Sequence, residues 1–308
     1  MLARRIVDPD LQPPMPFKAA DDYAQTVMAW AQEPFPDAVV ATRDVPYGSH
    51  RLQRYNVFAP RGATRAPVLV FWHGGGWTNG YRDYQTFMAP HITALGMVMV
   101  APSYRLTPEH PLPCAHEDGL TMLADLQRRL PQWGGAPDHV YLAGHSAGGH
   151  LAALAAVRVA DRAAAGLRPQ MIRGCLPISG IMDLHEPNPV AGSLEERVYT
   201  TVLKGLDPVN DTVQSPLFWT AGNTVPFALT FGQHDSARVI KSNRRMFGML
   251  SAQTAPASCS MEAGRDHFQT HTALRNAADS WYQRLAAMVA LYSLSSPSSP
   301  SSPSSPSN

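Results

Sequence analysis

The sequence predicts an α/β fold whose sheet is doubly wound and mostly parallel. Short apolar segments of β character alternate with helical segments along most of the chain, and such alternation is typical of βαβ units around a parallel sheet. The length of 308 residues and the hydrophobic content of 44% also suffice for the core of one large domain.

Strands are predicted from apolar runs bounded by turn residues, and helices from apolar residues at helical spacing. Asp21 and Asp22 favour a helix start, and Pro34 a helix end, around segment 19–32. Residues 52–58 alternate apolar and polar like an edge strand, whereas 67–72 form the continuous apolar run of a buried strand. The remaining strands are expected at 97–101, 139–143, 172–178, 226–231 and 257–261, and the remaining helices at 115–130, 146–160, 239–250 and 272–291.

We expect one domain over residues 1–292, with small cap elements at about 1–35 and 183–225. The second cap segment interrupts the alternation of strands and helices with four prolines, and a structureless loop of that size is unusual inside a compact domain. Residues 293–308 contain four Ser-Ser-Pro triplets. Because such a composition cannot bury a core, we expect a disordered tail there.

The bulk composition argues against several classes of partner. A formal net charge of +1 gives no electrostatic reason to expect nucleic acid or an acidic membrane surface. Three widely spaced cysteines argue against a disulfide framework and against a cysteine zinc site. No apolar run approaches the length of about 18 residues that a membrane span needs, so we expect no span and a cytoplasmic protein. The oligomeric state is left open, a homodimer included.

The pentapeptide Gly-His-Ser-Ala-Gly at residues 144–148 lies between an apolar strand and an Ala/Leu-rich helix. This strand–turn–helix setting is the one that a G-x-S-x-G nucleophile elbow requires. Small neighbours let the backbone turn sharply at Ser146, and the helix N-terminus stabilises negative charge there. The pattern alone occurs by chance in Ala/Gly-rich segments, but its setting favours Ser146 as a nucleophile.

A second glycine-rich loop, His-Gly-Gly-Gly-Trp at residues 73–77, follows a predicted buried strand. Backbone N–H groups in such a loop can hold the oxyanion of a tetrahedral intermediate, at about 3 kcal/mol per donor. We expect these donors at Gly74, Gly75 and Ala147. A phosphate loop is disfavoured because no G-K-[ST] follows, and His73 is expected to orient the loop by a hydrogen bond.

The acid and the base are expected after this elbow, with the acid first. Asp235 and His267 each follow a predicted strand in a short loop. His267 would accept the proton of Ser146, and Asp235 would hold the tautomer of the imidazole. Among the competing candidates, His234 and His271 are expected to be surface or supporting groups, and Asp266 is too close in sequence to orient the ring of His267 easily. Asp183 is the leading substitute acid.

From about residue 52 to residue 285, the chain resembles the α/β-hydrolase fold, and specifically esterases of the hormone-sensitive-lipase type with an HGGGW loop. The segment Tyr-Arg-Leu-Thr-Pro-Glu-His-Pro-Leu-Pro at 104–113, which leads to Glu-Asp-Gly at 117–119, resembles the same branch. That family usually has Asp in the elbow where this chain has His145.

The His145 version of the elbow is similar to that of kynurenine formamidases (arylformamidases). Ser-Gly-Ile-Met-Asp-Leu at 179–184 and Gly-Gln-His-Asp-Ser at 232–236 also resemble the formamidase pattern. The resemblance implies a triad of Ser146, Asp235 and His267, and it leaves the substrate open.

The motifs together predict acyl transfer through a covalent acyl-enzyme, with a small carboxylic ester or an aryl formamide as substrate. We expect neither a metal nor an organic cofactor. Trp77, Phe218, Trp219 and Phe268 are candidates for an apolar substrate pocket, although each could equally be ordinary packing. Two alternatives stay open: a kynurenine formamidase proper, and a non-catalytic small-molecule receptor on the same fold.

Overall fold

The computed structural model describes residue 12 and residues 17–293. The predicted Ser/Pro tail, from residue 294 on, lies outside the described residues. Residues 1–11 and 13–16 of the predicted cap element at 1–35 lie outside them as well.

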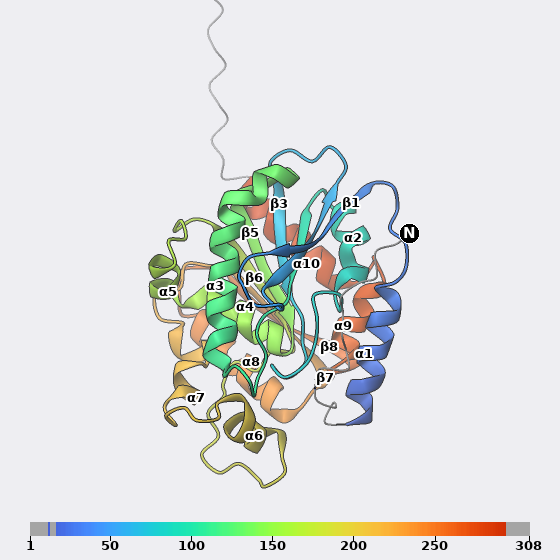
Figure 1. The fold of residues 1–308 in the computed structure, drawn as a ribbon. Coiled ribbons are helices and arrows are strands. Elements are labelled where there is room, and N and C mark those ends of the chain that lie inside the picture. Colours follow the sequence, from blue (N-terminus) through green and yellow to red (C-terminus); the bar gives the residue numbers. More distant parts are fainter. Residues whose placement is uncertain (1–11, 13–16, 294–308) are drawn as a thin grey trace, which may run out of the picture.

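A single eight-stranded sheet forms the centre of the molecule (Figure 1). Its spatial order is β1-β2-β4-β3-β5-β6-β7-β8. The pairs β1–β2 and β2–β4 are antiparallel, and every later pair from β4–β3 to β7–β8 is parallel. The predicted mostly parallel sheet is therefore confirmed. The strands are β1 (Val39–Pro46), β2 (Arg54–Pro60), β3 (Ala66–Trp72), β4 (Val98–Pro102), β5 (Gly135–His145), β6 (Ile172–Ile178), β7 (Phe227–His234) and β8 (Ala257–Asp266).

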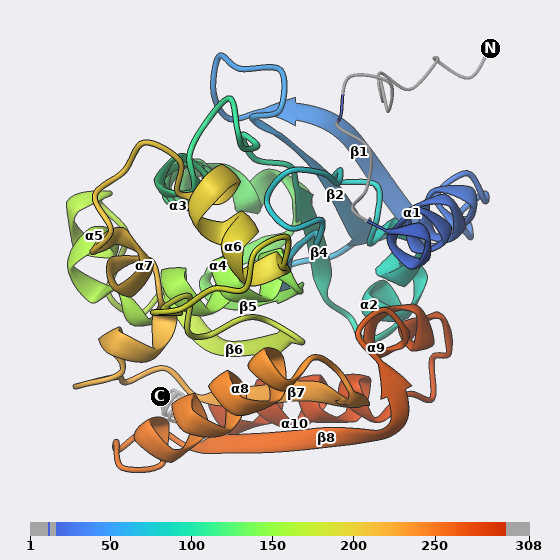
Figure 2. The same cartoon turned by 90° about the horizontal axis from the view of Figure 1, so that it is seen from below.

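Helices cover both faces of this sheet, as a doubly wound fold requires. In Figure 2, α3, α4 and α5 lie on one side of the sheet and α1, α2 and α9 on the other. The helices are α1 (Lys18–Trp30), α2 (Ala89–Ala94), α3 (Leu112–Arg129), α4 (Ala147–Val157), α5 (Val159–Ala164), α6 (Leu194–Arg197), α7 (Asn210–Val213), α8 (Ala237–Leu250), α9 (Gln269–Thr272) and α10 (Ser280–Ser293). Shorter turns are η2 (Thr86–Met88), η3 (Leu130–Trp133), the π-helical η4 (Val198–Val202), η5 (Pro216–Trp219) and η6 (Ala273–Arg275).

Three predicted elements differ from the structure. Residues 52–58 were expected to form an edge strand, but β1 pairs with β2 and forms the edge instead. The sequence did not predict β1 because most of its residues are exposed or half-exposed, so it lacks a clear apolar pattern. The helix expected at 146–160 divides into α4 and α5 at Arg158, whose backbone leaves the helical region. The helix expected at 272–291 is interrupted before Asp279, whose carboxylate accepts the N–H of Trp281 and starts α10.

The helix α4 positions the site because it runs through the core. Every residue of Ala147–Val157 is buried, and the helix packs against β3, β5 and β6. Its small residues allow this close approach: a Cβ on Gly148 would lie 2.2 Å from the carbonyl oxygen of Trp72. The first turn of α4 is thereby held against the carboxyl end of the central strand β3.

Candidate active site

Ser146 sits at the sharp turn between β5 and α4. Its φ of 55° and ψ of −119° belong to a region that non-glycine residues rarely adopt. The backbone is held in this conformation from both sides, because the N–H of Ser146 donates to Ile178 at 2.8 Å and its carbonyl accepts the N–H of His150 at 3.0 Å. The predicted strand–turn–helix setting of Ser146 is thus present.

Three predicted residues form a continuous hydrogen-bonded chain. The Oγ of Ser146 lies 2.8 Å from Nε2 of His267, and Nδ1 of the same ring lies 2.6 Å from Oδ1 of Asp235. These side chains come from three separate places, the β5–α4 turn, the loop after β7 and the loop after β8. With the imidazole neutral, a proton on Nδ1 donates to the carboxylate and leaves Nε2 free to accept the Ser146 hydroxyl.

The Asp235 carboxylate is buried and fully engaged. Its Oδ2 accepts the hydroxyl of Ser179 at 2.7 Å and the N–H of Gly232 at 2.8 Å. Burial acts to raise the pKa of Asp235, but hydrogen bonds and charge from His267, with the other two donors, outweigh it and hold this pKa below its ordinary value. The carboxylate is therefore ionised at neutral pH. The sequence marks Ser179 only as part of the segment 179–184 and does not predict this contact.

His145 is a second neighbour of His267, and in the sequence it stands out only as part of the elbow motif. Burial, followed by repulsion from His267 and His271, lowers the pKa of His145 well below its ordinary value, so its ring is neutral. Its Nε2–H donates to the backbone carbonyl of His267 at 2.8 Å. The hydroxyl of Tyr23, on α1, lies 2.8 Å from Nδ1 of His271 and 3.4 Å from Nδ1 of His145. The elbow is thus tied directly to the loop that carries His267.

The glycine loop after β3 lies beside Ser146. Gly75 and Gly76 line the same cavity as Ser146, whereas Gly74 is buried, with its Cβ direction toward Nδ1 of His145 at 2.9 Å. Gly75 has a φ of +123°, and a Cβ there would lie 2.1 Å from the carbonyl oxygen of Asn79, so only glycine fits. Gly76 was not among the expected oxyanion donors, although the HGGG pattern contains it.

The backbone N–H groups around Ser146 are free to bind a ligand. Within residues 17–293, no hydrogen bond to a protein acceptor engages the N–H of Gly75, Gly76 or Ala147. The His73 ring donates from Nδ1 to the carbonyl of Gly74 at 2.7 Å and stacks on Tyr104 at 4.3 Å. Burial lowers the pKa of His73 to about 4, so this ring orients the loop as a neutral group.

The competing candidates lie elsewhere in the site. His234 is exposed, and His271 is buried against Phe71 and the hydroxyl of Tyr23. One oxygen of Asp266 accepts the N–H groups of Phe268 and Gln269. Asp183 is paired with Arg245. His267 contacts none of these four side chains by a hydrogen bond in the described part of the chain.

A cavity of about 340 Å³ opens above Ser146. Its walls are mainly apolar, and they include two segments that lie far apart in the sequence as well as the loop that carries His267. The first segment contributes Phe17, Ala19, Ala20 and Tyr23, and the second contributes Leu194, Arg197, Val198 and Val202. These segments belong to the stretches 1–35 and 183–225 that we predicted as cap elements, and α6 lies at the lower end of the molecule in Figure 1.

Only one of the four expected pocket aromatics lines this cavity. Phe268 does so, and its ring meets His267 edge-on at 5.4 Å. Trp77 is instead buried with its ring against His150 at 5.1 Å. Phe218 and Trp219 lie outside the cavity on the surface, where Arg158 covers the indole of Trp219 at 4.6 Å. The prediction for these three residues was wrong because tertiary packing decides where an aromatic ring faces, as the contacts of Trp77 with His150 and of Trp219 with Arg158 show.

Away from this cavity, the described residues bring together one group of three side chains of the types that can ligate a metal. The ligand atoms of His50, Glu109 and His110 lie within 4.8 Å of one another. None of these residues lines the cavity of Ser146. None of the helices in the part of the chain that the structure describes is long and apolar enough to cross a bilayer.

The sheet order and the serine at the strand-to-helix turn define an α/β hydrolase. Comparison of the sequence with known families gives the same class: the pattern of the alpha/beta hydrolase fold family matches residues 69–267. The matched stretch runs from β3 to His267 and covers about two thirds of the chain. The protein belongs to this family.

Relatives in this family include both enzymes and a receptor. The gibberellin receptor GID1B of Arabidopsis thaliana is 40% identical over 100 residues, 31% of this chain and 28% of the receptor. Carboxylesterase NlhH of Mycobacterium tuberculosis is 31% identical over 172 residues, 52% of this chain and 54% of that enzyme. Kynurenine formamidase of Danio rerio is 32% identical over 145 residues, 46% of each chain. The chain therefore matches about half, or less, of the length of these relatives.

Solved structures share the fold over nearly the whole chain. Inhibited esterase B from Lactobacillus rhamnosis superposes with a TM-score of 0.75 at 22% identity, covering 90% of this chain and 95% of that structure. At this identity the likeness shows the fold alone.

Proposed function

We propose that the protein is a serine hydrolase that cleaves a small carboxylic ester or an aryl formamide through an acyl-enzyme. The observation that carries this proposal is the hydrogen-bonded chain from Ser146 through His267 to Asp235, at 2.8 and 2.6 Å. Such a chain activates a serine hydroxyl because the histidine accepts its proton while the carboxylate stabilises the resulting imidazolium. The carboxylesterase and formamidase relatives support the same chemistry.

Acyl transfer would begin with attack of the Ser146 Oγ on the substrate carbonyl carbon, while the hydroxyl proton passes to Nε2 of His267. The oxyanion would accept N–H groups of Gly75, Gly76 and Ala147; the role expected for Gly74 stays a prediction. As the tetrahedral intermediate collapses, His267 returns the proton to the departing alcohol or amine. Water then attacks the acyl-enzyme with His267 as base, which releases the acid and regenerates Ser146.

The size of the cavity favours small acyl groups. A volume of about 340 Å³ is near the lower end of roughly 300–1,000 Å³ found for small-molecule sites. An aryl leaving group already occupies a large share of such a space. We therefore expect acetyl or formyl groups to be transferred faster than an octanoyl group on the same leaving group.

A kinetic panel with a serine variant tests the proposal. The substrates are p-nitrophenyl acetate, p-nitrophenyl octanoate and N-formylkynurenine, and the variants are Ser146→Ala and, as a control, Ser251→Ala at an exposed site on α8's C-terminal end. We expect hydrolysis of the acetate, loss of at least about 10³-fold in Ser146→Ala, and parent rates in Ser251→Ala. A parent protein that hydrolyses no member of the panel but binds small molecules would favour the receptor alternative.

A further inference from the structure

One side chain in the catalytic cavity has a charge that the proposed chemistry does not use. Arg197, at the end of α6, is the only Arg or Lys among the described residues that line the cavity. No carboxylate of the described residues lies within 4.0 Å of its guanidinium, and the side chain is half-buried. An unpaired, partly desolvated guanidinium beside a reaction site is a binding site for an anion.

The acidic residues nearest in sequence are directed elsewhere. Glu196 accepts the N–H of Gly192 at 2.6 Å, and Glu195 lies 4.0 Å from Arg238. Among the described residues that line the cavity, the only carboxylate is that of Asp266, which accepts two backbone N–H groups at the start of α9. The charge of Arg197 is thus left for a ligand.

The position of Arg197 relative to the reacting atoms is fixed by one contact. Its Nη2 donates to Oγ1 of Thr78 at 3.0 Å. The hydroxyl of Thr78 donates in turn to Asn79 at 2.7 Å, and its backbone N–H donates to the carbonyl of Gly75 at 3.1 Å. The guanidinium is therefore bonded to the residue three positions after Gly75, and no acceptor among the described residues engages the other four of its five N–H groups.

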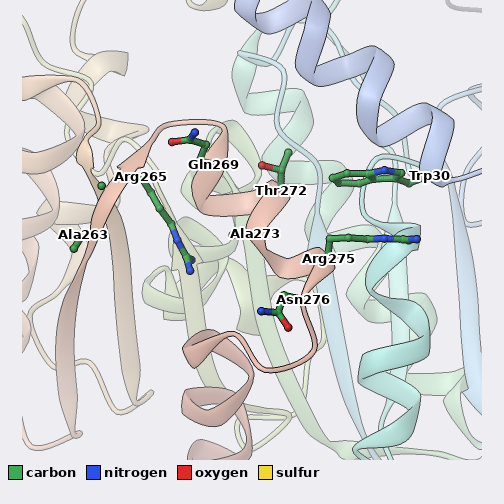
Figure 3. Close-up of a pocket in the computed structure, with 9 residues that line it drawn as sticks. Trp30, Ala263, Arg265, Gln269, Thr272, Ala273, Arg275 and Asn276 are labelled. Carbon is green, nitrogen blue, oxygen red and sulfur yellow. The ribbon is translucent and has the colours of Figure 1, made fainter.

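A second hollow on the surface contains two arginines whose guanidinium groups are each paired with a carboxylate. Figure 3 shows Arg275 lying along the face of Trp30, with Asn276 near it and Arg265 on the other side of the hollow. Arg275 pairs with Glu33 at 2.5 Å and Arg265 with Asp279 at 2.7 Å. Both cations of that hollow have carboxylate partners within the chain, whereas Arg197 has none among the described residues.

We infer that Arg197 recognises a carboxylate on the substrate, so that the natural substrate is an anionic ester or formamide with the carboxylate a few bonds from the scissile carbonyl. This inference rests on the proposed function. Two chemical types meet it: the half-ester of a short dicarboxylic acid, and an aryl formamide whose aryl part carries an amino acid. A bidentate guanidinium–carboxylate pair fixes the orientation of such a substrate as well as its affinity.

A matched pair of esters tests the inference: p-nitrophenyl valerate, which is neutral, and mono-p-nitrophenyl glutarate, which has a similar chain ending in a carboxylate. We expect the parent enzyme to prefer the glutarate in kcat/KM. In Arg197→Gln, KM for the glutarate should rise roughly tenfold to a hundredfold, while kinetics with the valerate change less than about twofold. Arg197→Lys should fall between parent and Arg197→Gln because it keeps the charge and loses the fork.

The control is Arg168→Gln, which removes an exposed guanidinium outside the cavity and should leave both esters unchanged. Parent enzyme without preference for the glutarate, or an equal loss with both esters in Arg197→Gln, would overturn the inference. A failure of the proposed function would give a different result: neither ester would be hydrolysed in a manner that depends on Ser146.

Discussion

Replacing Asp235 by Asn exchanges one carboxylate oxygen for an amide nitrogen. The hydrogen bonds of the site dictate which way the new amide group points. The Oδ2 of Asp235 accepts the N–H of Gly232, a group that can only donate. The amide of the variant must therefore place its oxygen toward Gly232 and its NH₂ toward Nδ1 of His267. Since Nδ1 then accepts a hydrogen bond, the ring carries its proton on Nε2 and cannot take the proton of Ser146.

The expected cost follows from this wrong tautomer. Loss of the correct tautomer in a serine triad lowers kcat by roughly 10⁴-fold, or about 5 kcal/mol of barrier at 1.36 kcal/mol per decade. The assay is steady-state hydrolysis of p-nitrophenyl acetate, with circular dichroism and thermal unfolding to show that the variant is folded. We expect KM to change little because Asp235 is buried behind His267 and does not line the cavity.

The matched control is Asp183→Asn. Asp183 was the leading substitute acid from the sequence, and in the structure it pairs with Arg245 instead of His267. We expect its kcat to stay within about threefold of the parent. A folded Asp235→Asn variant with more than a tenth of parent kcat, or a severe loss in Asp183→Asn, would refute the assignment of the acid.

Three further predictions concern the surroundings of the triad. Gly75→Ala should lower kcat by roughly 10²- to 10³-fold, because its Cβ would lie 2.1 Å from the carbonyl oxygen of Asn79 and displace the loop. Steady-state kinetics checks this, with thermal unfolding to show that the variant is as stable as the parent. Tyr23→Phe should cost about 1–3 kcal/mol in urea unfolding, because it removes the buried hydroxyl partner of His271; an unchanged midpoint would contradict it. Burial lowers the pKa of His150 to about 3, so between pH 6.5 and 3 the unfolded chain binds its proton before the folded chain does. The free energy of unfolding should then fall with decreasing pH, by about 1.4 kcal/mol per pH unit for this histidine, and His150→Gln should reduce the measured slope.

The sheet and the proximity of Ser146, His267 and Asp235 could be predicted because their signals are local. A continuous apolar run such as that of β3 or β6 fits only a buried strand, and both were located to within a residue. Ser146, Asp235 and His267 each follow a strand in a short loop. Since the carboxyl ends of parallel strands meet at one edge of a sheet, residues in such loops come together without any knowledge of the packing.

The rest of the site depends on contacts between distant segments. The hydrogen bond from His145 to the carbonyl of His267 joins residues 122 positions apart, and that from Arg197 to Thr78 joins residues 119 apart. Nothing in the neighbourhood of either residue encodes such a partner. The pocket predictions for Trp77 and Trp219 were wrong for the same reason. Tertiary packing decides whether an aromatic ring faces a cavity, and here it places Trp77 against His150 and Trp219 under Arg158.

Covalent labelling of Ser146 tests the central claim most directly. A fluorophosphonate probe reacts with a serine only when a base has activated it, and peptide mass spectrometry then locates the adduct. We predict one adduct per chain, on the peptide that contains Ser146, and its loss in Ser146→Ala. An unlabelled parent protein, or labelling that persists in Ser146→Ala, would contradict the account.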